Sequence, residues 1–318
     1  MRLLLTDEQR AFARSLDALL TAADTPSVIR SWSAGDHTAG RALWSRLAEA
    51  GVFALAVPEA YEGVGPLPVE LAVAFVELGR HAVPGPLVET VLAAALLAGV
   101  PEQAERLLPR LAAGTALATV GTRYALDGDA ADVVLTLRDG ELWLSPGCGP
   151  DARRSLDTAR RLATPLVGGE LLSTDVPPDA VVPARLATAA QALGVGLALL
   201  DRTVAYVGQR VQFGVPVGSF QAVKHRLADA KIALEFARPL LFGAALSMNP
   251  ADVAAAKVAA CEAAYTTART ALQLHGAIGY TAEYDLSLWL TKARALRTAW
   301  GDPAECRAVV LSGARPPS

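Results

Sequence analysis

The chain has 318 residues and a formal net charge of −3 at pH 7, and 52% of its residues are hydrophobic against 19% charged. Because binding to phosphate backbones needs a surplus of basic charge, we expect no nucleic-acid partner. The apolar content excludes general disorder and is enough for a large core and a subunit interface.

Residues 1–114 are predicted to form an N-terminal helical domain. Thr6, followed three residues later by Gln9, has the spacing of a capping box and predicts the start of a first helix. Apolar periodicity predicts further helices over about 38–50, 69–79 and 87–98. The short apolar run 52–57, which ends at Pro58, is expected to be extended.

Residues 115–182 are predicted to form a reduced, β-rich middle domain. Two strands, over about 132–138 and 141–144, flank the pair Asp139-Gly140, which is a signal for a two-residue hairpin. Proline, glycine, aspartate and arginine then dominate as far as Pro183, so we expect little regular structure there.

Residues 183–318 are predicted to form a C-terminal four-helix bundle. Helices are expected over about 184–212, 219–247, 250–275 and 285–298, with breaks at 213–216 and 276–279. The first and last of them are expected to carry more apolar face than one chain covers. The predicted fold class is therefore mainly α, with a small β-rich unit between two helical domains.

The location is predicted to be cytoplasmic. The uncharged stretches 91–100 and 186–200 are shorter than the roughly 20 residues of a membrane-spanning helix, and the N-terminus lacks the apolar region of a secretory signal. Cys148, Cys261 and Cys306 are spaced neither as a disulfide framework nor as a zinc site. We therefore expect a reducing compartment, no membrane span and no bound metal.

Three segments carry a functional signal. Residues 210–214 read R-V-Q-F-G and are followed by F-Q at 220–221, residues 273–280 read Q-L-H-G-A-I-G-Y, and residues 57–63 read V-P-E-A-Y-E-G. Arg210 offers a forked cation for a pyrophosphate or an adenine edge, and Phe213 offers a flat face for a ring. Gly276 and Gly279 allow a backbone to approach a phosphate closely.

Together these segments resemble the acyl-CoA dehydrogenase family of flavoproteins. One position departs from the family pattern, because Ala277 replaces a glycine. The resemblance implies FAD as the cofactor, an acyl-CoA as the substrate and α,β-dehydrogenation as the reaction. It also implies seven residues that contact FAD: Arg210, Gln212, Phe213, Gln221, Gln273, Leu274 and Gly276.

The catalytic glutamate of that family is missing from both of its usual positions. Those positions correspond here to Ala184 and Trp300, and neither side chain can accept a proton. The Trp300 indole is expected to fill the place of the thioester and close the site of this chain. Asp302 and Glu305 lie close by in the sequence and stay open as alternative bases.

The middle-domain segment that holds the flavin ring in the family, T-E-P-x-A-G-S-D, is also missing. Residues 120–127 read V-G-T-R-Y-A-L-D instead, and Trp143 is not followed by the expected threonine pattern. The chain thus keeps the adenine half of the flavin site and lacks the ring half. This combination resembles the shortened, non-catalytic subunit of actinobacterial α2β2 acyl-CoA dehydrogenases of steroid catabolism, which pairs with a longer, complete subunit.

The leading hypothesis is therefore a subunit of a heteromeric flavoprotein oxidoreductase of lipid degradation. The small residues Ala184, Ala187 and Gly194 are expected to leave room for a bulky, steroid-derived acyl group. The alternatives are a self-sufficient dehydrogenase with a relocated base, a flavin-free scaffolding subunit, and a flavin monooxygenase on the same fold. The last is disfavoured because it too must hold a flavin ring.

Overall fold

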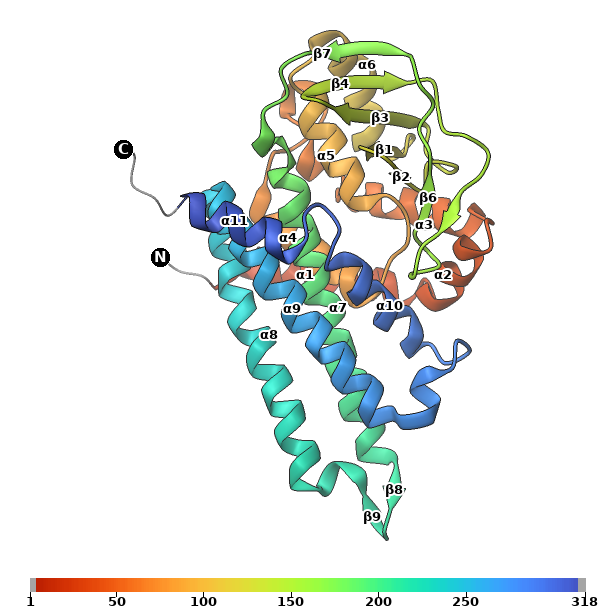
Figure 1. The fold of residues 1–318 in the computed structure, drawn as a ribbon, viewed down its shortest axis with the longest axis vertical. Helices are drawn as coiled ribbons and strands as arrows, with labels where there is room; N and C mark the ends of the chain where they lie inside the picture. Colours follow the sequence, from red (N-terminus) through yellow and green to blue (C-terminus); the bar gives the residue numbers. More distant parts are fainter. Residues whose placement is uncertain (1–3, 314–318) are drawn as a thin grey trace.

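The structure, a computed structural model, describes residues 4–313 and confirms the predicted fold class. Helices dominate both ends of this part of the chain, and a small sheet lies between them in the sequence. In space the sheet lies at one end of the molecule, and the three longest helices extend away from it (Figure 1). The predicted domain boundaries at 114/115 and 182/183 stay predictions.

The N-terminal region folds as short helices joined by tight turns. The predicted capping box is confirmed, since the Gln9 N–H donates to Thr6 Oγ1 and the Thr6 N–H donates to Gln9 Oε1. The second and sixth helices, each with a proline in the first turn, were not predicted individually. The helices are α1 (Asp7–Thr21), α2 (Thr25–Ser33), α3 (Thr38–Glu49), α4 (Pro68–Arg80), α5 (Leu87–Leu97) and α6 (Pro101–Ala112).

The run 52–57 is not extended as predicted, because it contains a short 3₁₀ helix, Ala54–Ala56. The Val57 N–H donates to the Ala54 carbonyl, which turns the backbone on itself. This turn buries Phe53 and Val57 in the core. Burial of the apolar side chains is thus achieved by a tight turn rather than by strand pairing.

The middle region forms a mixed sheet whose seven strands lie in the order β5-β6-β2-β1-β3-β4-β7 within the described residues. The predicted hairpin is confirmed, because β3 and β4 pair antiparallel around Asp139 and Gly140, both of which have positive φ. Thr90 Oγ1 on α5 donates to the Ala118 carbonyl at 2.9 Å, which ties α5 to β1. The strands are β1 (Ala118–Gly121), β2 (Ala125–Leu126), β3 (Val133–Arg138), β4 (Glu141–Ser145), β5 (Arg153–Arg154), β6 (Arg161–Ala163) and β7 (Glu170–Ser173).

The C-terminal region contains the four predicted helices and one more that was not predicted. The first long helix ends at Gln209, three residues before the predicted end at about Gln212, and a two-stranded hairpin of β8 (Val211–Gln212) and β9 (Val215–Pro216) follows it. The additional helix starts at Pro303, a residue type that favours the first turn. The helices are α7 (Val182–Gln209), α8 (Gln221–Ser247), α9 (Pro250–His275), α10 (Leu286–Leu296) and α11 (Pro303–Gly313).

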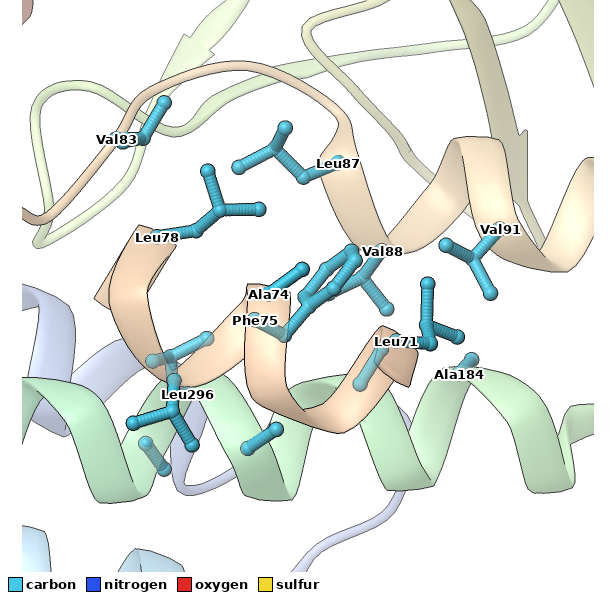
Figure 2. Close-up of a cluster of buried hydrophobic side chains, with 14 of the residues drawn as sticks. Leu71, Ala74, Phe75, Leu78, Val83, Leu87, Val88, Val91, Ala184 and Leu296 are labelled. Atoms are coloured by element: carbon cyan, nitrogen blue, oxygen red, sulfur yellow. The ribbon is translucent and has the colours of Figure 1, made fainter. Parts of the chain in front are cut away.

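Helix α7 lies in the centre of the molecule and packs against α4 and α9. The backbones of α4 and α7 approach closely at Gly194, where a Cβ atom would stand 1.9 Å from the Val76 carbonyl oxygen. Ala184 and Ala187 are fully buried, and Figure 2 shows Ala184 beside Leu71 in the apolar cluster of α4 and α5. The expectation that these small residues open a substrate pocket is therefore wrong, because they serve close helix packing.

The apolar surplus predicted for the first and last C-terminal helices is also wrong. Residues 178–209 form a helical stretch long and apolar enough to cross a membrane, but 72% of its most apolar window is buried inside the structure. Most apolar side chains of α10 are buried as well. Exposed large apolar residues instead follow the outer side of α8. We call this set the α8 face; it comprises Ile232, Phe236, Leu240 and Leu246.

Glu77 on α4 provides a test of this packing through the pH dependence of stability. Its side chain is only 14% exposed and lies 3.6 Å from the Arg80 guanidinium, and burial raises its pKa from 4.5 to about 7. The folded chain therefore holds an extra proton between about pH 4.5 and pH 7, so the free energy of unfolding falls as pH rises through that window.

We expect the substitution Glu77→Gln to remove this decrease in the free energy of unfolding. At pH 8 the variant should be more stable than the wild type by on the order of 2 kcal/mol, and at pH 4 the two should be equally stable. Urea unfolding at both pH values measures the difference. An equal gain at pH 4 and pH 8 would show that the carboxyl does not titrate as described.

Candidate functional site

The seven residues predicted to contact FAD lie toward one end of the C-terminal helices (Figure 1). Arg210 is the residue that ends α7, and Gln212 and Phe213 belong to the β8–β9 hairpin that follows it. Gln221 is the first residue of α8. The remaining three, Gln273, Leu274 and Gly276, are at the end of α9 and just after it. We call this end of the molecule the bundle tip.

Tyr206 and His275 support Arg210 at the bundle tip. Arg210 Nη1 donates to the Tyr206 hydroxyl at 2.7 Å, and this hydroxyl donates to the His275 carbonyl at 3.3 Å. The Tyr206 and His275 rings stack with centroids 4.1 Å apart. Burial lowers the pKa of His275, so its ring is neutral, and Nδ1 donates to the Ala271 carbonyl. The ends of α7 and α9 are thereby joined, and Arg210 stays exposed.

The remaining groups of the bundle tip are open to solvent. Phe213 is 93% exposed and has a positive φ of 54°. Gly276 has a φ of 64° and a ψ of −139°, which only glycine adopts readily, and nothing lies within 4 Å of the position of a Cβ atom. Arg226 donates to Gln273 Oε1 and adds a second cation. A forked cation, an exposed ring and an open glycine backbone fit an adenine–pyrophosphate group.

Sequence reasoning missed two residues of this cluster. Tyr206 lies one helical turn before Arg210, at the spacing at which two side chains of a helix meet, so the sequence did contain a signal for it. Arg226 gave no such signal, because it meets Gln273 only through the packing of α8 against α9.

The structure gives the two predicted positions of the catalytic base, Ala184 and Trp300, different environments, and their assignment to that role stays a prediction. Ala184 is fully buried in the core. Trp300 lies between α10 and α11 with a positive φ of 55°. Its indole Nε1 donates to Glu89 Oε1 at 3.1 Å, and its carbonyl accepts from Arg185 Nε at 3.0 Å. Trp300 is thus held in an unfavourable backbone conformation by specific side chains.

The alternative bases, Asp302 and Glu305, form the cap of α11. Asp302 Oδ1 accepts from the Glu305 N–H at 2.8 Å, and Glu305 Oε2 accepts from the Asp302 N–H at 2.8 Å. This reciprocal arrangement is a capping box, which accounts for both carboxyls without a catalytic role. Glu305 also lies on the wall of the pocket described next.

The expectation that Trp300 closes the site is wrong, because a pocket of about 550 Å³ lies beside it. The indole does not fill this space, since it is turned toward Glu89. The segment without the flavin-ring motif contributes Thr122 and Tyr124 to the wall. We call this space the interdomain pocket; its other walls come from α5, α7, β3, β6 and the chain from Ala299 to Val309.

Glu89 is the residue of the interdomain pocket that sequence reasoning missed. Its side chain is only 3% exposed, and burial raises its pKa, opposed first by the nearby Arg160 guanidinium. Asp127 is fully buried nearby, and burial raises its pKa to about 7. The sequence did contain a signal for Glu89, because it is the only acidic residue within the apolar run 87–97, but the prediction of a helix there made no use of it.

Between Asp7 and Gly313, no group of three His, Cys, Asp or Glu residues is placed to hold a metal ion.

Comparison with protein-family models gives two matches. The model of the acyl-CoA dehydrogenase N-terminal domain matches residues 6–115, and the model of the acyl-CoA dehydrogenase C-terminal domain matches residues 175–310. The unmatched segment between them, residues 116–174, contains all seven strands of the mixed sheet.

Curated relatives cover almost the whole chain. The chain is 35% identical over 304 residues to the acyl-CoA dehydrogenase IpdE2 of Mycobacterium tuberculosis, covering 94% of this chain and 95% of that one. It is 33% identical over 307 residues to IpdE2 of Mycolicibacterium smegmatis, covering 95% and 97%. Among solved structures, a chain of the ChsE4-ChsE5 complex from Mycobacterium tuberculosis gives a TM-score of 0.86 at 25% identity, covering 100% of this chain and 100% of that one.

Proposed function

Since the chain belongs to the acyl-CoA dehydrogenase family, we propose that it is a subunit of a heteromeric FAD-dependent acyl-CoA dehydrogenase. In this proposal it supplies the adenine and pyrophosphate half of a flavin site and has no catalytic base of its own. A longer, complete subunit supplies the ring half and the base, in an α2β2 assembly.

The observation that carries the proposal is the openness of the bundle tip. The exposed Arg210, Phe213 and Gly276 are the elements of a nucleotide site, but they stand at a surface rather than in a cavity of their own chain. Such residues hold a dinucleotide firmly only when another surface covers it, because an exposed ion pair contributes little in water. A partner subunit provides that surface in the proposal.

In the proposed complex this chain binds and orients the cofactor. FAD, when bound, supplies the hydride acceptor for α,β-dehydrogenation. Arg210 and Arg226 would balance the pyrophosphate charge, and Phe213 would lie against a ring of the cofactor. The proton from the α carbon goes to the partner's glutamate, because Ala184 and Trp300 cannot accept it.

The α8 face supports a partner subunit. A helix that exposes Ile232, Phe236 and Leu240 at successive four-residue spacings presents a continuous apolar strip. Strips of this kind mark protein interaction sites in soluble proteins. The similarity to the ChsE4-ChsE5 complex supports the same proposal, because that structure contains two different named chains.

The proposed substrate is a CoA thioester with a steroid-derived acyl group. The thioester follows from the family, whereas the steroid-derived group rests on the resemblance of the sequence to subunits of steroid catabolism. A screen of CoA thioesters with the purified complex tests this choice, with short-chain acyl-CoA as the comparison.

A self-sufficient dehydrogenase is a second candidate function, and it is favoured by one observation, the presence of Glu305 on the wall of the interdomain pocket. We expect the substitutions Asp302→Asn and Glu305→Gln to leave turnover of the complex close to wild type, because both side chains cap α11. Substitution of the partner's catalytic glutamate should abolish turnover. A loss of about a hundredfold or more in either cap variant, with flavin and assembly intact, would assign the base to this chain.

A further inference from the structure

We propose that Tyr206 is a positioning residue of the flavin half-site, whose hydroxyl holds the Arg210 guanidinium in the orientation in which it meets the cofactor. The inference rests on the proposed function, because it takes the bundle tip as the place where FAD binds. It deepens that function by adding a residue outside the seven predicted contacts, one that acts on FAD only through Arg210.

The backbone of Arg210 is fixed, whereas its side chain needs support. The Arg210 N–H donates to the Tyr206 carbonyl at 2.9 Å, and the Arg210 carbonyl accepts from the Val217 N–H at 2.8 Å. The side chain is exposed, and a free arginine side chain samples many rotamers. Ordering such a side chain on binding reduces affinity, so a protein group that orders it beforehand raises affinity.

The Tyr206 hydroxyl supplies this order through one defined hydrogen bond. An arginine carries only donors, so the hydroxyl accepts from Arg210 Nη1 at 2.7 Å, and its own proton is donated to the His275 carbonyl at 3.3 Å. The bond engages only Nη1 of the guanidinium. The edge formed by Nε and Nη2 has no protein partner within residues 4–313, and an edge of this kind binds two oxygens of a phosphate at once.

His275 in turn fixes the Tyr206 ring. The two rings stack with an interplanar angle of 19° and centroids 4.1 Å apart, and His275 is 1% exposed. His275 Nδ1 donates to the Ala271 carbonyl at 2.8 Å, which sets the plane of the imidazole. Because burial lowers the pKa of His275, its ring is neutral around pH 7 and places no further positive charge close to Arg210. The phenol is therefore held by α9 while it orders the side chain at the end of α7.

The test is a double-mutant cycle on the FAD affinity of the complex, measured by fluorescence titration of the apo-complex. Tyr206→Phe removes only the hydroxyl and keeps the ring that stacks on His275. We expect it to weaken FAD binding roughly 2- to 12-fold when Arg210 is present, since the cofactor must then order the arginine itself. In the Arg210→Ala background the same substitution should have no further effect. A tyrosine that merely stabilised the bundle tip would change the affinity equally in both backgrounds.

Tyr265→Phe is the matched control, because it removes another tyrosine hydroxyl that accepts a hydrogen bond from an arginine. The Tyr265 hydroxyl accepts from Arg294 Nη1 at 3.0 Å. Tyr265 also belongs to α9 but lies roughly 15 Å before His275 along the helix, away from the bundle tip. The control should keep the wild-type FAD affinity, and the thermal unfolding of each variant complex checks that its fold is retained.

The proposal is overturned if Tyr206→Phe binds FAD as tightly as the wild type while Arg210→Ala binds it weakly. It is equally overturned if Tyr206→Phe weakens binding by the same factor in both backgrounds, or if Tyr265→Phe weakens it as much. Wild-type affinity in Arg210→Ala would contradict the assignment of Arg210 to the cofactor and overturn the inference together with it. Failure of the proposed half-site is thus distinguished from failure of the positioning role alone.

Discussion

The substitution Arg210→Ala should weaken FAD binding by the complex about 10- to 150-fold. A hydrogen bond to a charged group contributes about 1.5–3 kcal/mol, and the exposed guanidinium at the bundle tip is the group we assign to the phosphate or adenine. Fluorescence titration of the apo-complex with FAD measures the affinity, and calorimetry provides an independent value. The bundle itself should keep its stability, because Arg210 is exposed and its only side-chain hydrogen bond within residues 4–313 is to the Tyr206 hydroxyl.

Two further variants define the contribution of the guanidinium. Arg210→Lys keeps the charge and loses the fork, so its affinity should lie between those of the wild type and the alanine variant. Arg14→Ala removes an exposed arginine from α1 and should leave FAD affinity unchanged. Wild-type affinity in Arg210→Ala would show that this residue only caps α7.

The substitution Phe236→Asp should disrupt the complex with the partner subunit. Phe236 lies in the middle of the α8 face and is 71% exposed in the isolated chain. Buried aromatic residues in the centre of an interface typically contribute 2 kcal/mol or more, so we expect the dissociation constant to rise at least about 30-fold. Analytical ultracentrifugation of the co-expressed subunits measures the change.

Val167→Asp is the matched control, because it places the same charge at an exposed apolar residue of the middle region. It should leave the assembly intact. The folded state of each separate chain is checked by its thermal unfolding, since an exposed position tolerates the aspartate. Complete assembly of Phe236→Asp would exclude the α8 face as the contact with the partner.

The order and type of most elements followed from local patterns in the sequence. The capping box at Thr6, the Asp139-Gly140 hairpin and the break between α7 and α8 are all set by residues close in sequence. Such signals depend on backbone conformation and local hydrogen bonds, which a sequence shows directly. The run 52–57, by contrast, was wrongly predicted. Its turn depends on burial against distant helices, which no local pattern in the sequence shows.

The sites were predictable only in part. The motif residues of the bundle tip were found because they cluster in two short segments, and their roles stay predictions. The link between Glu89 and Trp300 joins residues 211 positions apart, and no local pattern announces such a contact. The volume beside Trp300 was missed for a similar reason, since the direction of its indole is set by Glu89, Arg185 and the left-handed backbone.

The ratio of flavin to subunits in the co-purified complex tests the central claim most directly. FAD is released by denaturation and measured by its visible absorbance, and the two chains are counted by amino-acid analysis of the separated subunits. The half-site account predicts one FAD for each pair of unlike subunits, and no tightly bound flavin when this chain is purified alone. Two FAD molecules per unlike pair, or a flavin-loaded homo-oligomer of this chain with dehydrogenase turnover, would contradict it.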